Sequence, residues 1–210
     1  MEKRIVFATG NENKMVEIRM ILSDLGLPVY SMKEAGVDVE IIEDGISFEE
    51  NAEIKARAVA RVLTNDIVLA DDSGLVVDAL DGAPGIYSAR YAGENATDAD
   101  RIAKLLREMQ GIPPEERNAR FVSAVCCVFP DGRKIIVRGE CEGSIGQIPQ
   151  GNDGFGYDPV FVTESGKTFA ELTPQEKDAV SHRGIALRKL AEQLKQVLAA
   201  EEKNSKEIDQ

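Results

Sequence analysis

Two adjacent aspartates, Asp71 and Asp72, follow a short apolar run and precede Ser73 and Gly74. Successive residues of an extended chain point to opposite sides, so at most one of these carboxylates should face a given site. Acids beside a hydroxyl suit a hard cation such as Mg²⁺, which takes few protein carboxylates and fills its shell with water and phosphate oxygens. A turn with solvated acids fits the same residues equally well.

A second candidate site follows the first expected strand, where the chain turns into an expected helix. Unpaired backbone N–H groups and the helix dipole favour an anion at such a point, and a lysine stands close by. The segment is neither a Walker loop nor a dinucleotide fingerprint. An ordinary strand-to-helix turn is the competing interpretation. The residues concerned are Thr9, Gly10, Asn11, Glu12, Asn13 and Lys14.

Three further patterns are weaker on their own. Glu43, at the end of an alternating acidic and apolar run, could add a second carboxylate for a metal ion. The Gly-rich segment 151–158 carries one Phe and one Tyr, which could stack on a flat ring or fill the core beneath a loop. Lys177 and the run Ser181-His182-Arg183 contain the single histidine of the chain, which excludes a multi-histidine zinc site.

The bulk composition limits the partners. The chain has 210 residues and a formal net charge of −12, which disfavours binding to a nucleic-acid backbone. A polyphosphate ligand therefore has to be held by local cations or through a divalent metal ion. No segment approaches the length of a membrane span, and the N-terminus reads as a strand without a signal peptide. Three cysteines without a CxxC pair predict buried thiols and a reducing cytoplasm.

Hydrophobic periodicity predicts the elements that position these residues. Strands are expected at 4–8, 37–42, 66–70 with a continuation at 75–80, 121–129, 134–141 and 159–162, and 144–148 could add another. Helices are expected at about 15–25, 47–63, 97–109 and 183–201, and a polar tail at 202–210. Early alternation followed by a meander predicts an α/β fold with a mixed sheet, and one domain over 1–201 with two lobes around a cleft.

Five blocks, in this order, closely resemble the inosine-triphosphatase (Ham1-like) family of nucleoside-triphosphate pyrophosphatases. The resemblance runs from Val6 to about Leu190. One departure precedes the FGYD motif, where many relatives have Gly-Thr-Gly-Gly and this chain has Gly-Asn-Asp-Gly, which bears on fine substrate preference. The blocks are ATGNENK (8–14), SFEENAEIKA (47–56), LADDSGLVVDALDGAPGIYSARYAG (69–93), GFGYDPVF (154–161) and KDAVSHRG (177–184).

The resemblance implies an elongated mixed sheet flanked by helices, a central cleft and usually a homodimer. It implies hydrolysis of dITP, ITP and XTP to a monophosphate and pyrophosphate, with Mg²⁺ held by Glu43 and Asp72. Asp72 resembles the catalytic proton acceptor. Residues 9–14 and Ser73 resemble the triphosphate site, and Lys55 resembles a further phosphate cation. The residues that resemble the base-binding set are Phe155, Gly156, Tyr157, Asp158, Lys177, His182 and Arg183.

Two alternatives stay open at this point. A Maf-like pyrophosphatase on a related fold would act on pyrimidine or modified nucleotides, although the GFGYDP and SHRG blocks disfavour it. A non-catalytic nucleotide-binding module would need the cations but not the acids. The presence of Glu43 and Asp72 together with Ser73 favours turnover over binding alone.

Overall fold

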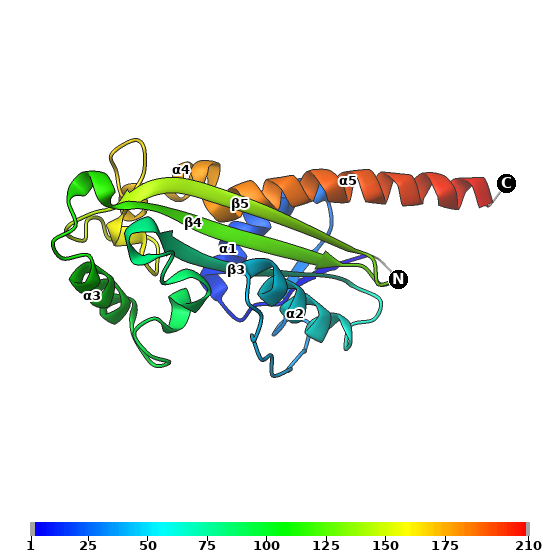
Figure 1. Ribbon diagram of the computed structural model, residues 1–210. Helices are drawn as coiled ribbons and strands as arrows, with labels where there is room; N and C mark the ends of the chain where they lie inside the picture. Colours follow the sequence, from blue (N-terminus) through cyan, green and yellow to red (C-terminus); the bar gives the residue numbers. More distant parts are fainter. Residues whose placement is uncertain (1–2, 209–210) are drawn as a thin grey trace.

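The computed structural model describes residues 3–208, in which one six-stranded sheet forms the centre of the molecule (Figure 1). The strand order is β2-β1-β3-β4-β5-β6; β1 pairs in parallel with β2 and β3, and the remaining pairs are antiparallel. The expected mixed sheet is therefore present. The strands are β1 (Ile5–Phe7), β2 (Val29–Ser31), β3 (Ile67–Val77), β4 (Asn118–Val128), β5 (Lys134–Ile145) and β6 (Phe161–Val162).

Helices cover both faces of the sheet. α1 and α5 pack on one face, and α2 packs on the other against β3 and β4. Short 3₁₀ turns connect several elements, among them Gly85–Arg90 and Asp158–Val160. The α-helices are α1 (Glu12–Leu22), α2 (Phe48–Ala60), α3 (Asp98–Glu108), α4 (Pro174–Val180) and α5 (His182–Ile208).

Three hydrophobic clusters explain the elongated shape. Two lie on opposite faces of the half of the sheet that contains β1, under α1 with α5 and under α2. The third lies in the other half, where α3 and the segment 157–172 pack on the far ends of β3, β4 and β5. The three long strands run through both halves and so hold the two cores in one body (Figure 1). Cys126, Cys127 and Cys141 are buried free thiols, as expected.

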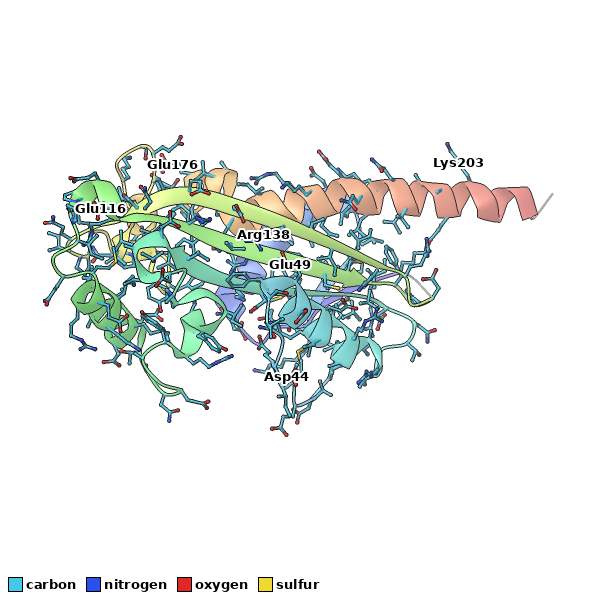
Figure 2. All side chains as sticks on the ribbon, viewed as in Figure 1. Asp44, Glu49, Glu116, Arg138, Glu176 and Lys203 are labelled. Atoms are coloured by element: carbon cyan, nitrogen blue, oxygen red, sulfur yellow. The ribbon has the colours of Figure 1, made fainter. Side chains whose placement is uncertain are left out.

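The helix starts follow the expected capping. Ser47 Oγ accepts from the backbone N–H of Glu50 at 3.1 Å and begins α2, although the Glu50 carboxylate accepts from Ile46 N–H and so does not close a full capping box. Thr97 and Asp100 form a complete capping box at α3. Side chains join the layers as well: Arg138 of β5 donates to Glu49 at the start of α2 at 2.9 Å (Figure 2).

The structure corrects four sequence predictions. Residues 37–42 form no strand, because they run past α2 without pairing to the sheet. The Asp71-Asp72-Ser73-Gly74 segment is no turn, because β3 passes straight through it while paired to β4. Residues 144–148 add no separate strand, because β5 extends to Ile145. β2 and α4 were not predicted at all.

The C-terminal end also differs from the prediction. α5 continues to Ile208, beyond the expected end near Glu201, and its last turns extend past the β4–β5 hairpin (Figure 1). Residues 209 and 210 of the predicted tail lie outside the described residues, as does the side chain of Asn13. No helix within residues 3–208 is long and apolar enough to cross a membrane.

Candidate active site

The site is built on an open edge of β3. β1 pairs with one edge of β3, and this pairing ends where Phe7 lies opposite Leu69. Beyond Leu69, no strand of the described chain lies beside this edge until Val76 forms a bridge with Pro84. Leu69 O and Leu75 N both face this edge, since they bond to Ala8 N and Ser88 Oγ. Backbone groups of a strand alternate in direction, so the N–H of Ser73 faces the same open edge.

The turn after β1 leads directly to this edge. Asn11 N–H donates to Thr9 Oγ1 at 3.1 Å, and the Asn11 side chain caps α1 by accepting from Lys14 N–H at 3.2 Å. Gly10 and Glu12, the other described members of the predicted phosphate turn, lie beside them on the surface. The N-terminal N–H groups and the positive end of the α1 dipole therefore stand next to the unpaired part of β3.

One face of β3 carries Asp71 inside a cluster of cations. Lys14 Nζ lies 3.0 Å from both Asp71 oxygens, Arg183 Nε lies 3.3 Å from Oδ2, and Ser73 Oγ donates to Oδ2 at 2.7 Å. Burial alone would raise the pKa of Asp71, but Lys14, Arg183 and Lys55 outweigh it and hold the pKa far below its usual range. Asp71 is therefore a permanently ionised counter-ion.

The opposite face of β3 carries Asp72 in a different setting. Asn51 Nδ2 donates to Oδ2 at 3.2 Å, and Lys55 Nζ donates to Oδ1 at 3.1 Å. Lys55 Nζ also donates to Glu43 Oε2 at 2.7 Å. Burial raises the pKa of Asp72, and Glu43 adds to that rise, against the lowering effects of Lys55 and Asn51.

The two predicted metal ligands are therefore brought together from distant segments. Asn51 fixes this arrangement, because its side-chain oxygen accepts from Gly45 N–H at 2.9 Å while its amide group holds Asp72. Within residues 3–208 no group of three or more His, Cys, Asp or Glu side chains could hold a metal ion. Two hard carboxylates that already converge on one ammonium group fit Mg²⁺, which needs only one or two carboxylates beside phosphate and water.

A pocket of about 330 Å³ continues from this edge toward α4 and α5. Phe155 forms one wall, with Lys177 Nζ 4.6 Å and Arg183 Cζ 5.7 Å from its ring centroid. The exposed Asp153 does not line it. The pocket shares Asn11, Lys14 and Ser73 with the open edge of β3, so the aromatic wall and this edge form one continuous site.

Asp158 organises the loop that carries this wall. Its Oδ2 accepts from Phe155 N–H at 2.8 Å and from Lys177 Nζ at 2.7 Å. Gly156 N–H is held by Asp98 at 2.7 Å. Tyr157 is buried in the core of its half, and its hydroxyl donates to Ser88 O at 2.9 Å. Phe155 and Tyr157 therefore both line the pocket, and the hydroxyl of Tyr157 also anchors the loop to the backbone of Ser88.

His182 lines the same pocket as a neutral ring. It stacks on Phe121 with ring centroids 4.7 Å apart, and burial together with Arg183 and Lys177 lowers its pKa well below the usual value. Its Nδ1 is buried and has no hydrogen-bond partner among the described residues. A buried polar atom without a partner is costly, so a ligand that supplies the missing hydrogen bond is favoured here.

Sequence reasoning missed several residues that build the site. Glu17 of α1 accepts from both Arg183 and Lys177, Ser123 contacts Ser73 Oγ at 3.2 Å, and Asn51 and Asp98 hold the loops described above. A signal for Glu17 existed, because it lies one helical turn after Lys14 and next to the buried Ile18. No sequence pattern pointed to Ser123, because only the pairing of β3 with β4 places Ser123 opposite Ser73.

Comparisons with known proteins show the family to which the chain belongs. The family model described as the Ham1 family matches residues 5–193. A dITP/XTP pyrophosphatase of Clostridium perfringens is 48% identical over 202 residues, which cover 93% of this chain and 99% of that protein. The structure of a HAM1 protein from Coxiella burnetii matches with a TM-score of 0.84 at 43% identity, covering 92% of this chain and 99% of that one. The Staphylococcus aureus Ham1 protein matches with a TM-score of 0.83 at 40% identity, over 92% and 98% of the two chains. The chain therefore belongs to the Ham1 family.

Proposed function

We propose that this protein hydrolyses deaminated purine nucleoside triphosphates, namely dITP, ITP and XTP, to the monophosphate and pyrophosphate. Nearly full-length relatives named dITP/XTP pyrophosphatase support this activity. The observation that carries the proposal is the convergence of Glu43 and Asp72 beside the open edge of β3, which continues into the pocket lined by Phe155. No observation favours a Maf-like enzyme or a non-catalytic module.

Glu43 and Asp72 are the residues that would hold Mg²⁺. When bound there, the ion would offset phosphate charge and polarise the phosphorus under attack. Two carboxylates leave most of the coordination shell free for water and phosphate oxygens, as magnesium requires.

Asp72 is the proposed catalytic residue. It accepts a proton from a water molecule whose oxygen forms a new bond to the α-phosphorus, while the bond from that phosphorus to the bridging oxygen breaks. The bridging oxygen leaves with pyrophosphate. A carboxylate whose pKa is raised by burial is a better proton acceptor than an ordinary aspartate at neutral pH. No nucleophilic side chain is needed for this displacement.

The phosphates are held along the edge of β3. Lys14, the N–H groups that begin α1 and the Ser73 hydroxyl supply fixed positive potential from one side. Lys55 supplies a cation from the other side. Asp71 keeps the Lys14 ammonium group in place, so this group needs little rearrangement when a triphosphate binds.

The base is read in the pocket between Phe155 and His182. Hypoxanthine and xanthine carry an oxygen at position 6, which can accept hydrogen bonds from Arg183 and from His182. Adenine has an amino group there, so the buried donors would be left unpaired, which costs enough to give strong discrimination. Stacking on Phe155 adds affinity for any flat base.

The family also suggests the oligomeric state, the cellular location and the partners of the protein. We expect a homodimer that acts on free nucleotides in the cytoplasm, without binding nucleic acid or a membrane. The net charge of −12 supports a preference for small ligands, because repulsion from a nucleic-acid backbone is not offset by any general positive charge.

A panel of nucleoside triphosphates tests the proposal. Each of ITP, dITP, XTP, ATP, GTP, CTP and UTP is incubated with and without Mg²⁺, and monophosphate and pyrophosphate are quantified. We expect rapid metal-dependent cleavage of the first three only. Guanine also carries an oxygen at position 6, so GTP has to be rejected through its 2-amino group meeting a blocked or mismatched edge of the pocket. Preferred cleavage of pyrimidine nucleotides would favour the Maf-like alternative, and binding without turnover would favour the non-catalytic module.

A further inference from the structure

The Lys55 ammonium occupies the point at which the two proposed metal ligands meet. Its Nζ lies 2.7 Å from Glu43 Oε2 and 3.1 Å from Asp72 Oδ1. The Lys55 and Asp72 side chains are each 12% exposed, so water screens this contact only weakly. A metal ion bound by these two carboxylates and the ammonium group in its present place would have to share the same oxygens.

Side chains of α2 hold the two carboxylates in this arrangement. Asn51 lies one turn before Lys55 on α2 and binds both Asp72 and the backbone of Gly45, two residues after Glu43. α2 itself is fixed by its Ser47 cap and by Ala52 and Ala56, which are fully buried against the sheet. Two neighbouring carboxylates held in this way need a cation beside them, because like charges this close destabilise each other.

We propose that Lys55 is the resident cation of the nucleotide-free protein, so that the Glu43–Asp72 pair binds a divalent metal ion weakly until a triphosphate draws Lys55 away. The inference rests on the proposed function, in which Lys55 is a phosphate cation. Lysine suits this double role, because its ammonium group is a compact charge on a flexible four-carbon stem. Phosphate oxygens at the edge of β3, beside Asp72, would offer Lys55 a second set of acceptors.

The consequence is an order of assembly. A metal ion alone competes with an intramolecular ammonium group for the same two carboxylates. A metal ion that arrives with a triphosphate does not, because the phosphates satisfy Lys55. Lys55 is thus a positioning residue that ties metal affinity to the presence of substrate.

A titration of the free protein with Mn²⁺ tests this directly, with the unbound ion followed by electron paramagnetic resonance at about pH 8, where carboxylates are ionised. Lys55→Met should bind Mn²⁺ at least about tenfold more tightly than the wild type, since a charge close to both ligands is removed. Lys55→Arg keeps the charge and should stay as weak as the wild type. Lys134→Met is the matched control, because Lys134 pairs with Glu53 at 2.6 Å and should leave the affinity unchanged.

A further variant locates the effect. Adding Glu43→Gln to Lys55→Met should abolish the gain in Mn²⁺ affinity. Unchanged or weaker Mn²⁺ binding by Lys55→Met, or a gain that survives Glu43→Gln, would overturn the proposal. Circular dichroism checks the fold, and Lys55→Gln replaces Lys55→Met if that variant does not fold. No step of the titration involves hydrolysis, so its failure is distinct from failure of the substrate panel.

Discussion

Asp71 and Asp72 are adjacent in β3, yet they lie in two different electrostatic environments on opposite faces of the strand. Asp71 faces α1 and α5, where Lys14, Arg183 and Ser73 surround it and lower its pKa. Asp72 faces α2, where burial and Glu43 raise its pKa in spite of Lys55. A pleated strand thus places two identical side chains in opposite environments one residue apart, so that the pKa of Asp71 is lowered and that of Asp72 is raised.

The difference shows how the two faces of β3 can serve two tasks, phosphate binding on one face and metal binding with proton transfer on the other. The Asp71 face holds cations in place and contains no group that needs to change its protonation state. The Asp72 face holds two carboxylates bridged by one ammonium group, which suits the proposed metal binding and proton transfer. A triphosphate along the open edge of β3 would contact both faces, so binding and chemistry are separated by the thickness of one strand.

Replacing each aspartate by asparagine gives the largest expected contrast. Asp72→Asn removes the proposed proton acceptor and a proposed metal ligand, so kcat for ITP should fall by about 10²–10⁴-fold with the fold intact. Asp71→Asn leaves Lys14 and Arg183 without the carboxylate that holds them in place. We therefore expect it to weaken substrate binding, so that KM rises more than kcat falls. Steady-state kinetics with a circular dichroism check measure both. Equal effects of the two changes on kcat would remove the distinction between the faces.

Arg183→Ala tests the reading of the base from the Asp71 face. The ratio of kcat/KM for ITP to that for ATP should fall by about 10–100-fold, the equivalent of roughly 1–3 kcal/mol for a buried donor. Arg183→Lys keeps the charge beside Asp71 but not the planar fork, and should recover part of the activity without the full ratio. An unchanged ratio in Arg183→Ala would show that the arginine does not read the base.

Gly139→Ala tests whether close packing between β5 and the start of α5, which carries Arg183, stabilises the fold on the Asp71 side of the sheet. A Cβ atom at Gly139 would lie 2.2 Å from His182 O and 2.5 Å from Ala186 N, so the start of α5 would have to move. We expect a loss of about 1–3 kcal/mol in the free energy of unfolding, measured with a denaturant. Gly146→Ala, whose nearest new contact would be 3.4 Å from Val162 Cγ2, is the control and should change little.

The acid limb of the pH profile of kcat/KM gives the smallest expected difference between Asp71 and Asp72, and it requires no substitution. In the proposed mechanism Asp72 must be ionised to accept a proton, and its pKa is raised first by burial and then by Glu43. As the pH falls through that raised pKa, the carboxylate gains a proton, so kcat/KM should fall at a higher pH than the value of about 4 of an ordinary aspartate. Asp71, with its lowered pKa, stays ionised throughout. A limb at or below about pH 4 would contradict this assignment.

Much of this arrangement could be predicted from the sequence. The alternation rule alone separated Asp71 from Asp72, and the hairpin and helix patterns located β4, β5 and α3. The position of β3 through the DDSG segment could not, because Asp, Ser and Gly favour turns locally and only the pairing with β4 keeps them extended. Residues 37–42 alternate like a strand, yet they pair with no strand of the sheet, so the alternation alone did not predict their structure.

The contacts inside the site were the least predictable part. Lys55 was expected to bind phosphate, and its bridge between Glu43 and Asp72 depends on where α2 lies on the sheet. Glu17 pairs with two cations that come from the other end of the chain. Such pairings arise only when distant segments meet, so a local pattern can place Glu17 on the same side of α1 as Lys14 but does not specify its partners.

The fate of the attacking oxygen tests the central claim most directly. Hydrolysis of ITP in water enriched in ¹⁸O, followed by mass spectrometry of both products, identifies the phosphorus that is attacked. If water bound near Asp72 attacks the α-phosphorus, one ¹⁸O atom should appear in the monophosphate and none in pyrophosphate. Label in pyrophosphate, or release of inorganic phosphate in its place, would contradict the account.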